Sequence, residues 1–275
     1  MKKFAAFSKK FICLFMSLCI LFLTTACTVS EKRDDAQLAQ MDECQNYIEE
    51  ELGVEIVEDG NMVSYVYSQD DCKMTYDTEN GNFYYTDEDG TYPLEITDIS
   101  EDGVISWTIE KEDETLEGQV NTSEAPSAQV AIAIAGTSYL VYTFVYCMFK
   151  AAVVVTVAGT TCYLASAAAD AIKRNSKKYN YFPAYKVGNN VYVATKIGLT
   201  KAKAVARIKS GKNVWAKNAD YAWSACVAAS PIGVAEWGWH GNRDTSSGYY
   251  PHYHAIKYYK SNGQYVHTGA HCWYL

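Results

Sequence analysis

The segment from Gln129 to Ala169 constrains the fold most, because only one of its 41 residues, Lys150, carries a charge. Such a segment must avoid water, either in a bilayer or in a protein interior. It is too long for one membrane span of about 20 residues, and its mixture of small and apolar residues favours two closely packed helices, 130–149 and 151–169. The sequence therefore predicts a hydrophobic helical hairpin.

Three placements of this hairpin are open. A membrane hairpin leaves both flanks outside the cell, whereas a single tilted span puts the basic cluster at 173–178 inside, as the positive-inside tendency prefers. A hairpin buried in protein is the third arrangement. We expect transmembrane insertion, because the run is longer than most buried helices. The basic cluster has a second interpretation as a protease-accessible linker.

The N-terminus has the pattern of an export signal. Four lysines precede an uncharged run from Phe11 to Ala26, which ends in small residues before Cys27. A basic region, an apolar core and small residues ahead of a cysteine resemble a bacterial lipoprotein signal. We expect residues 1–26 to be a signal peptide, and Cys27 to carry a diacylglycerol that holds the protein on the outer face of the cell membrane. Ordinary secretion and an uncleaved signal anchor are the alternatives.

Charge divides the rest of the chain into an acidic and a basic part, which excludes an evenly charged globule. Residues 31–125 contain 28 acidic and four basic side chains, whereas residues 126–275 contain four acidic and 16 basic ones. This division predicts an acidic module at 27–125, a hydrophobic segment with a basic linker at 126–178, and a basic domain at 179–275. We expect the acidic module to be a solvated surface; because opposite charges attract, the alternative is that it masks the basic domain.

The acidic module is predicted to be a helix followed by an antiparallel meander. Apolar residues at three- and four-residue steps predict a helix from Leu38 to Leu52. Alternation with a period of two then predicts strands, separated by turns such as Asn80-Gly81 and Asp102-Gly103. The predicted strands are 54–57, 62–67, 83–86 and 104–109. The module contains no histidine, and its carboxylates form no catalytic pattern.

Six cysteines follow Cys27, two in each of three segments. Since an exported protein can form disulfides, one bridge per segment is the simplest expectation. The pairs would be Cys44–Cys72, Cys147–Cys162 and Cys226–Cys272. Unpaired buried thiols are an equally good interpretation. The chain has no CxxC motif, so neither a redox motif nor a cysteine zinc site is indicated.

The basic C-terminal domain mixes helices and strands. We expect a hairpin at 185–194, helices at 201–210 and 219–229, and strands at 250–259 and 264–274. Thr200 and Asn218 are good N-caps, and Trp223 and Cys226 are predicted on the buried side of the second helix. The predicted fold class of the whole chain is α+β: an acidic helix-plus-meander module, a hydrophobic helical hairpin and a small α+β C-terminal domain.

All histidines of the chain lie in the last 36 residues: His240, His252, His254, His267 and His271. In a strand, His252 and His254 point the same way, and an antiparallel partner strand brings His271 toward them. Glu236 is predicted on a Gly-rich loop just before them, and Arg243 follows. Several imidazoles beside a carboxylate and a guanidinium suit proton transfer near neutral pH.

On a basic domain, this set of side chains predicts cleavage of an RNA phosphodiester. One histidine would accept the proton of a 2′-hydroxyl, a second would protonate the leaving oxygen, and Arg243 or a lysine would stabilise charge on the phosphate. The candidate catalytic residues are Glu236, His240, Arg243, His252, His254 and His271. Three carboxylates are too few for a two-metal nuclease, and no cofactor is assigned. A single zinc or other transition metal held by His252, His254 and His271 stays open.

Four motifs follow one another from Ala204 onward. They are the helix before Gly211 and Val214, the pair His240-Gly241, the run Tyr250-Pro251-His252-Tyr253-His254, and the run His271-Cys272-Trp273-Tyr274. This order resembles the C-terminal domains of secreted, polymorphic-type toxins of Gram-positive bacteria. The chain departs from that family at Ala255, where Pro is frequent, and at Leu275, where Gly is usual. The resemblance implies a toxin, commonly held to be nucleolytic, with a dedicated immunity protein as its partner.

Three functions therefore compete. The first is an exported, lipid-anchored toxin whose C-terminal domain cleaves RNA. The second is a non-enzymatic surface lipoprotein whose tyrosines and tryptophans bind a cell-envelope ligand. The third is a membrane-active protein that acts through the apolar segment at 130–169. Replacement of His252 and His254 by alanine should abolish the first activity, weaken the second only slightly and spare the third.

Overall fold

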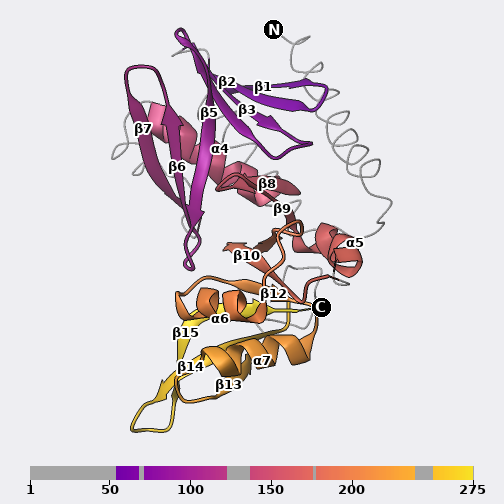
Figure 1. The fold of residues 1–275 in the computed structure, drawn as a ribbon. Coiled ribbons are helices and arrows are strands. Elements are labelled where there is room, and N and C mark those ends of the chain that lie inside the picture. Colours follow the sequence, from indigo (N-terminus) through magenta and orange to yellow (C-terminus); the bar gives the residue numbers. More distant parts are fainter. Residues whose placement is uncertain (1–53, 68–70, 123–136, 176–177, 239–249, 275) are drawn as a thin grey trace, which may run out of the picture. The chain divides into compact units, whose positions relative to one another are not determined.

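The computed structural model describes residues 54–67, 71–122, 137–175, 178–238 and 250–274 (Figure 1). Several of the sequence predictions lie outside these residues. They are the signal peptide, the lipidation site Cys27, the helix predicted at 38–52, Cys44, His240 and Arg243. The fold and the candidate site are built from the described residues alone.

The acidic module is an antiparallel meander, as its alternating pattern predicts. Its strands are β1 (Val54–Asp59), β2 (Met62–Tyr67), β3 (Cys72–Asp77), β4 (Phe83–Asp87), β5 (Gly90–Ile99), β6 (Val104–Glu110) and β7 (Thr115–Asn121). The four predicted strands are confirmed, whereas β3, β5 and β7 were missed. The turn glycines Gly81 and Gly103 have φ of 73° and 78°, a conformation that glycine adopts without steric cost.

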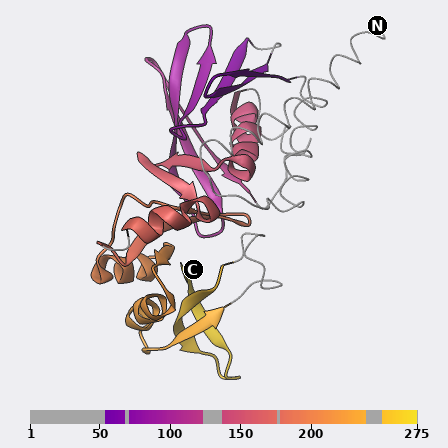
Figure 2. The same cartoon turned by 90° about the vertical axis from the view of Figure 1, so that its right-hand side faces the viewer.

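Helix α4 (Thr137–Ala151) packs on this meander through its apolar face. Val141, Val145 and Phe149 are fully buried. Phe144 makes edge-on contacts with Tyr65 and Phe83, with ring centroids 5.1 and 6.0 Å apart. The apolar side chains of α4 therefore belong to the core of the protein. Figure 2 shows the helix lying against the strands of the meander.

The prediction of a helical hairpin at 130–169 is wrong. After α4 the chain forms a β-hairpin, β8 (Val154–Val157) and β9 (Thr160–Leu164), and only then helix α5 (Ala165–Asn175). The two-residue turn at Ala158-Gly159 has positive φ at both positions, 46° and 68°, as the tight turns of β-hairpins require. The run of Val and Thr on either side favours extended backbone, which the apolar count alone did not reveal.

The predictions of transmembrane helices and of an α+β fold class are also wrong. No helix among the described residues is both long and apolar enough to cross a membrane; α4 has 15 residues and α5 has 11. Strands predominate instead: 15 strands and four helices occur in the described part of the chain, and the strands are linked in one mixed sheet. The hairpin β8–β9 creates that link, because β8 pairs with β5 and β9 with β11.

The C-terminal elements continue the same sheet. Its strands here are β10 (Tyr181–Val187), β11 (Asn190–Val193), β12 (Val214–Ala216), β13 (Ala235–Gly238), β14 (His252–Tyr259) and β15 (Tyr265–Trp273), in the order β11-β10-β12-β15-β14-β13. Among the strands of the described residues, only β12–β15 and β5–β8 are parallel pairs. A core of Ile172, Phe182, Trp215 and Trp273 joins α5 to these strands, so the boundary predicted at residue 178 crosses a continuous core.

Helices α6 (Lys201–Lys209) and α7 (Ala219–Ala229) cover one face of β14 and β15. Both predicted N-caps are confirmed: the hydroxyl of Thr200 accepts from the Lys203 N–H at 3.3 Å, and Asn218 Oδ1 accepts from the Tyr221 N–H at 3.1 Å. The prediction that Trp223 is buried is wrong, since this residue is 51% exposed. Small residues, not the tryptophan, make the contact of α7 with the sheet.

Three of the cysteines considered for disulfides are buried free thiols in the structure: Cys162, Cys226 and Cys272. The thiol of Cys226 donates to the carbonyl of Tyr253 at 3.3 Å, and Cys272 lies beside it in the layer between α7 and the sheet. Burial and the neighbouring thiol raise the pKa of Cys272 well above its usual value, and burial raises the pKa of Cys162 to about 12. For these three cysteines the interpretation as unpaired buried thiols therefore holds, and the disulfides Cys147–Cys162 and Cys226–Cys272 are absent from the structure.

Candidate functional site

Three neighbouring strands place the histidines on one face of the sheet. In the antiparallel register, Glu236 of β13 lies opposite His254 of β14, and His254 lies opposite His271 of β15. His252 lies two residues before His254 and therefore on the same face. The helices α6 and α7 occupy the other face, where Tyr253 and Cys272 point. The predicted meeting of His271 with His252 and His254 is confirmed.

The three histidines His252, His254 and His271, named here the imidazole trio, are buried, with 1%, 8% and 7% of their surface exposed. Their ring centroids lie 4.4 to 4.9 Å apart. One ring nitrogen of each can be chosen so that all three lie within 4.8 Å of one another. Buried polar rings in mutual contact are uncommon, because burial of a polar group must be offset by hydrogen bonds or by a ligand.

Each ring of the trio is held by an oxygen acceptor at Nδ1. His252 Nδ1 lies 2.9 Å from the carbonyl oxygen of Tyr250, and His254 Nδ1 lies 3.2 Å from that of Ala270. His271 Nδ1 lies 3.3 Å from Asn213 Oδ1. Because these oxygens only accept, each neutral ring carries its proton on Nδ1 and keeps a lone pair on Nε2. The three rings thus share one tautomer.

Asn213 is a site residue that the sequence did not predict. It lies just before β12 and is buried, and its Oδ1 also accepts from the backbone N–H of His271 at 2.8 Å. The backbone carbonyl of Asn213 accepts from Arg207 Nε at 2.8 Å and from the Ala184 N–H at 3.2 Å. These bonds hold the backbone of Asn213, and the bond from the His271 N–H holds its side chain against His271. Nothing in the surrounding sequence distinguishes this asparagine from one in an ordinary turn.

At the exposed edge of the trio, His267 Nε2 is hydrogen-bonded to a carboxylate oxygen of Glu236. The two side chains are 38% and 36% exposed. The ring of His267 stacks on that of His254, with centroids 4.6 Å apart and planes 12° apart. Glu236 was predicted on a loop, but it belongs to strand β13, and pairing with β14 is what directs it toward the histidines.

A glycine makes room for the innermost ring. A Cβ atom on Gly238 would lie 2.5 Å from His252 Nε2, so no larger residue fits there unless the ring moves. On the opposite side, Trp273 stacks on His271 with ring centroids 4.9 Å apart and planes 5° apart. The trio therefore lies between a backbone strand and an indole ring. Of the predicted catalytic residues, the structure brings together Glu236, His252, His254 and His271; His240 and Arg243 lie outside the described residues.

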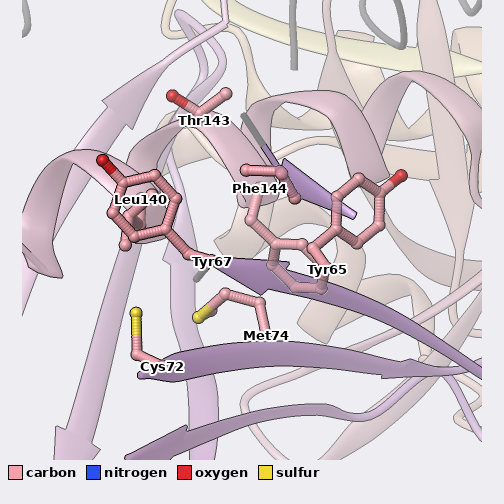
Figure 3. Close-up of a pocket in the computed structure, with 8 residues that line it drawn as sticks. Tyr65, Tyr67, Cys72, Met74, Leu140, Thr143 and Phe144 are labelled. Atoms are coloured by element: carbon pink, nitrogen blue, oxygen red, sulfur yellow. The ribbon is translucent and has the colours of Figure 1, made fainter. Parts of the chain in front are cut away.

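The cavity of the acidic module is a poor alternative site. It lies between the first three strands and α4 and has a volume of about 20 Å³. Figure 3 shows apolar and aromatic side chains around it, among them Tyr65, Met74 and Phe144. Pockets for small molecules are usually of several hundred Å³ and contain a few convergent polar groups. The imidazole trio is the stronger candidate.

Comparison of the chain with known protein families, with curated proteins and with solved structures found no match. The chemistry of the site must therefore be read from its residues. Buried imidazoles with fixed tautomers, next to an exposed histidine–carboxylate pair, can move protons, hold a metal ion or do both.

Proposed function

We propose that the histidine face of β13–β15 cleaves RNA, and that the protein is an exported toxin of the polymorphic type. The observation that carries this proposal is the exposed pair of His267 and Glu236, stacked on the buried imidazole trio. An exposed histidine oriented by a carboxylate is a general base in contact with solvent, where a substrate can reach it.

In this proposal the carboxylate of Glu236 holds the Nε2–H of His267, which leaves Nδ1 to accept the proton of a 2′-hydroxyl. The 2′-oxygen then attacks the adjacent phosphorus, and the leaving 5′-oxygen takes up a proton. That proton is donated by a second imidazole in its protonated form, and the nearest one is His254. The 16 basic and four acidic residues of 126–275 favour a polyanionic substrate.

Two contacts support masking of the basic part by the acidic module. Lys212 Nζ lies 3.5 Å from Asp98, which belongs to β5. The carboxylate of Glu101, in the turn after β5, lies against Gly269 of β15, where a side chain would not fit. The second contact lies on β15, the strand that carries His267, but His267 itself stays 38% exposed, so this masking is partial and leaves the site open to a substrate. We retain export, lipid anchoring through Cys27 and an immunity protein as parts of the proposal.

The test uses the chain from residue 28 onward, because the core around Trp215 excludes cutting it at residue 178. We expect this protein to cleave a labelled RNA and leave a 2′,3′-cyclic phosphate. His267→Ala and Glu236→Gln should lower the rate by about 100-fold or more, the usual contribution of general acid–base catalysis. Trp223→Ala, an exposed change on α7, is the control and should keep full activity. Intact RNA with wild-type protein, or equal cleavage by His267→Ala, would refute the proposal.

A second candidate function is binding of a cell-envelope ligand, and exposed aromatic residues favour it. Trp237, Tyr258, Tyr259 and Tyr265 are all about half exposed. Such side chains are common anchors in binding interfaces. Tyr258→Ser with Tyr265→Ser should then reduce co-sedimentation with purified cell walls and leave RNA cleavage unchanged. The third function, damage through a helical membrane hairpin, is dropped because that hairpin does not exist.

A further inference from the structure

The imidazole trio has the chemistry of a metal site, and this can be argued without any assumption about a substrate. Its donor set consists of three neutral imidazoles from two paired strands. Nitrogen donors of this kind suit zinc, copper, nickel and cobalt, whereas magnesium and calcium prefer oxygen. A set of three histidines leaves a fourth position of a zinc tetrahedron open, as in catalytic zinc sites.

The surroundings of the trio match those of metal-bound histidines. A histidine that binds a metal usually donates its other ring N–H to a carbonyl, a carboxylate or a water, and this bond fixes the ring. All three rings have such a bond, to Tyr250, Ala270 and Asn213. The fixed tautomer leaves Nε2 of each ring as the donor. Three independent acceptors with the same effect are the strongest observation in favour of a metal.

The spacing of the ring nitrogens is also compatible with a bound metal ion. One ring nitrogen of each histidine lies within 4.8 Å of the others, whereas nitrogens around a tetrahedral zinc are roughly 3.3 Å apart for bonds of about 2.0–2.1 Å. Small rotations of rings that already touch would close this gap. We propose that His252, His254 and His271 bind one divalent transition metal ion of the zinc class, with one coordination position open.

The open position has a consequence that rests on the proposed function. Since His267 stacks on His254 and contacts Glu236, the pair lies at the exposed side of the trio. With His252, His254 and His271 holding the ion, a water bound at the open position would be more acidic than free water, and it would replace His254 as the source of the proton for the leaving 5′-oxygen. His267 would accept the proton of the 2′-hydroxyl as the 2′-oxygen bonds to phosphorus, and would return that proton to the bound hydroxide.

The first measurement is the metal content of the chain from residue 28 onward, after incubation with zinc and dialysis. We expect one zinc per chain, and we expect cobalt in its place to give the intense visible bands of a four-coordinate site. Failure to retain any zinc, or an octahedral cobalt spectrum, would overturn the assignment. This measurement uses the unmutated protein, so it does not depend on whether a variant folds.

Variants then locate the ion. His252→Ala, His254→Ala and His271→Ala should each weaken zinc binding at least 100-fold in competition with a chromophoric chelator. Gly238→Ala should also weaken it, since its Cβ would displace the His252 ring without removing a donor. The matched control is His267→Ala, on the same strand as His271 but outside the trio, and it should bind zinc as the wild type does. Equal loss in the control, or no loss in the trio variants, would overturn the assignment.

RNA cleavage by the zinc-loaded protein, measured with and without a strong chelator, separates this inference from the proposed function. If zinc binds to the trio and the zinc-loaded protein leaves RNA intact without the chelator, the metal site stands and the nuclease proposal falls. If RNA is cleaved by a protein that retains no zinc and is insensitive to the chelator, the nuclease proposal stands and the metal site falls.

Discussion

Two parts of the sheet, the acidic module β1–β7 and the C-terminal strands β13–β15, share a local construction and differ in what they bury. Both have antiparallel neighbours with side chains alternating between two faces. In β6 the inward positions are Ile105, Trp107 and Ile109, whereas in β14 two of them are His252 and His254. The difference shows that formal charge is a poor guide to the site, since the region richest in charge buries almost none of it.

Several charged and hydroxyl groups of the acidic module pair with one another locally. Lys111 pairs with Asp87, Asp89 and Glu114 at 2.9 to 3.4 Å. The buried hydroxyls of Ser64 and Thr75 share a hydrogen bond of 3.0 Å. Groups paired in this way hold a fold together and need no ligand. The imidazole trio instead brings one ring nitrogen of each histidine within 4.8 Å of the others, as a shared metal ion requires.

The largest expected effect comes from the core. Trp215→Ala and Trp107→Ala each remove a buried indole and should lower the free energy of unfolding by about 3–5 kcal/mol, as measured by urea denaturation. Only Trp215→Ala should also impair zinc binding, because Trp215 packs edge-on against Tyr250 at 5.0 Å and the Tyr250 carbonyl holds His252. Equal impairment by both variants would mean that the two regions are not separable.

The second largest effect is the loss of stability when a buried hydrogen bond is removed, which we compare between the two regions. Asn213→Leu removes the acceptor of the His271 N–H and should destabilise the protein by about 1–3 kcal/mol, because a buried donor is left unsatisfied. The double change Ser64→Ala with Thr75→Val removes both partners of one bond and should change stability by less than about 1 kcal/mol. Urea denaturation of both variants tests this order, and a costlier double change would contradict it.

The smallest effect depends on pH. Burial favours the neutral form of Asp87, but the hydrogen bond from Lys111 and that from the Asp89 N–H outweigh it and lower the pKa of Asp87. A lowered carboxylate pKa stabilises the fold above the ordinary value of about 3.9, and this contribution is lost as pH falls through the lowered pKa.

Lys111→Met should therefore lower the thermal midpoint at pH 7, and the difference from the wild type should shrink as the pH falls below about 4. Thermal unfolding followed by circular dichroism between pH 2 and pH 7 is the measurement. Lys203→Met, on α6, is the control with the same change of charge. A difference from the wild type that is constant with pH would show that the Lys111 cluster is not electrostatic in origin.

The sequence predicted the elements that local signals determine. Thr200 and Asn218 begin their helices, and glycines such as Gly81 and Gly103 turn the meander, because caps and turns depend on a few neighbouring residues. The period of two also placed His252 and His254 on one face, and the closing strand brought His271 to them. The common face of the site could therefore be predicted.

The predictions that failed concern features that depend on residues far away in the chain. The apolar count at 130–169 could not distinguish a membrane from a protein core, and the strand preference of Val153–Val157 was overlooked. Trp223 was assigned to the core by its type, but the contact of α7 with the sheet is made of alanines and Cys226. Asn213 carries no local signal, because its role arises from β12 pairing with a strand that comes much later in the chain.

That late pairing has a kinetic consequence. Strand β15 lies between β12 and β14, and the contact of His271 with Asn213 joins residues 58 positions apart. Closing so long a loop costs entropy before any contact repays it, so this part of the sheet should form slowly. The imidazoles come together only when β15 takes its place. If the chain is exported unfolded, as the proposed function implies, its histidines would come together only after export, when this part of the sheet forms.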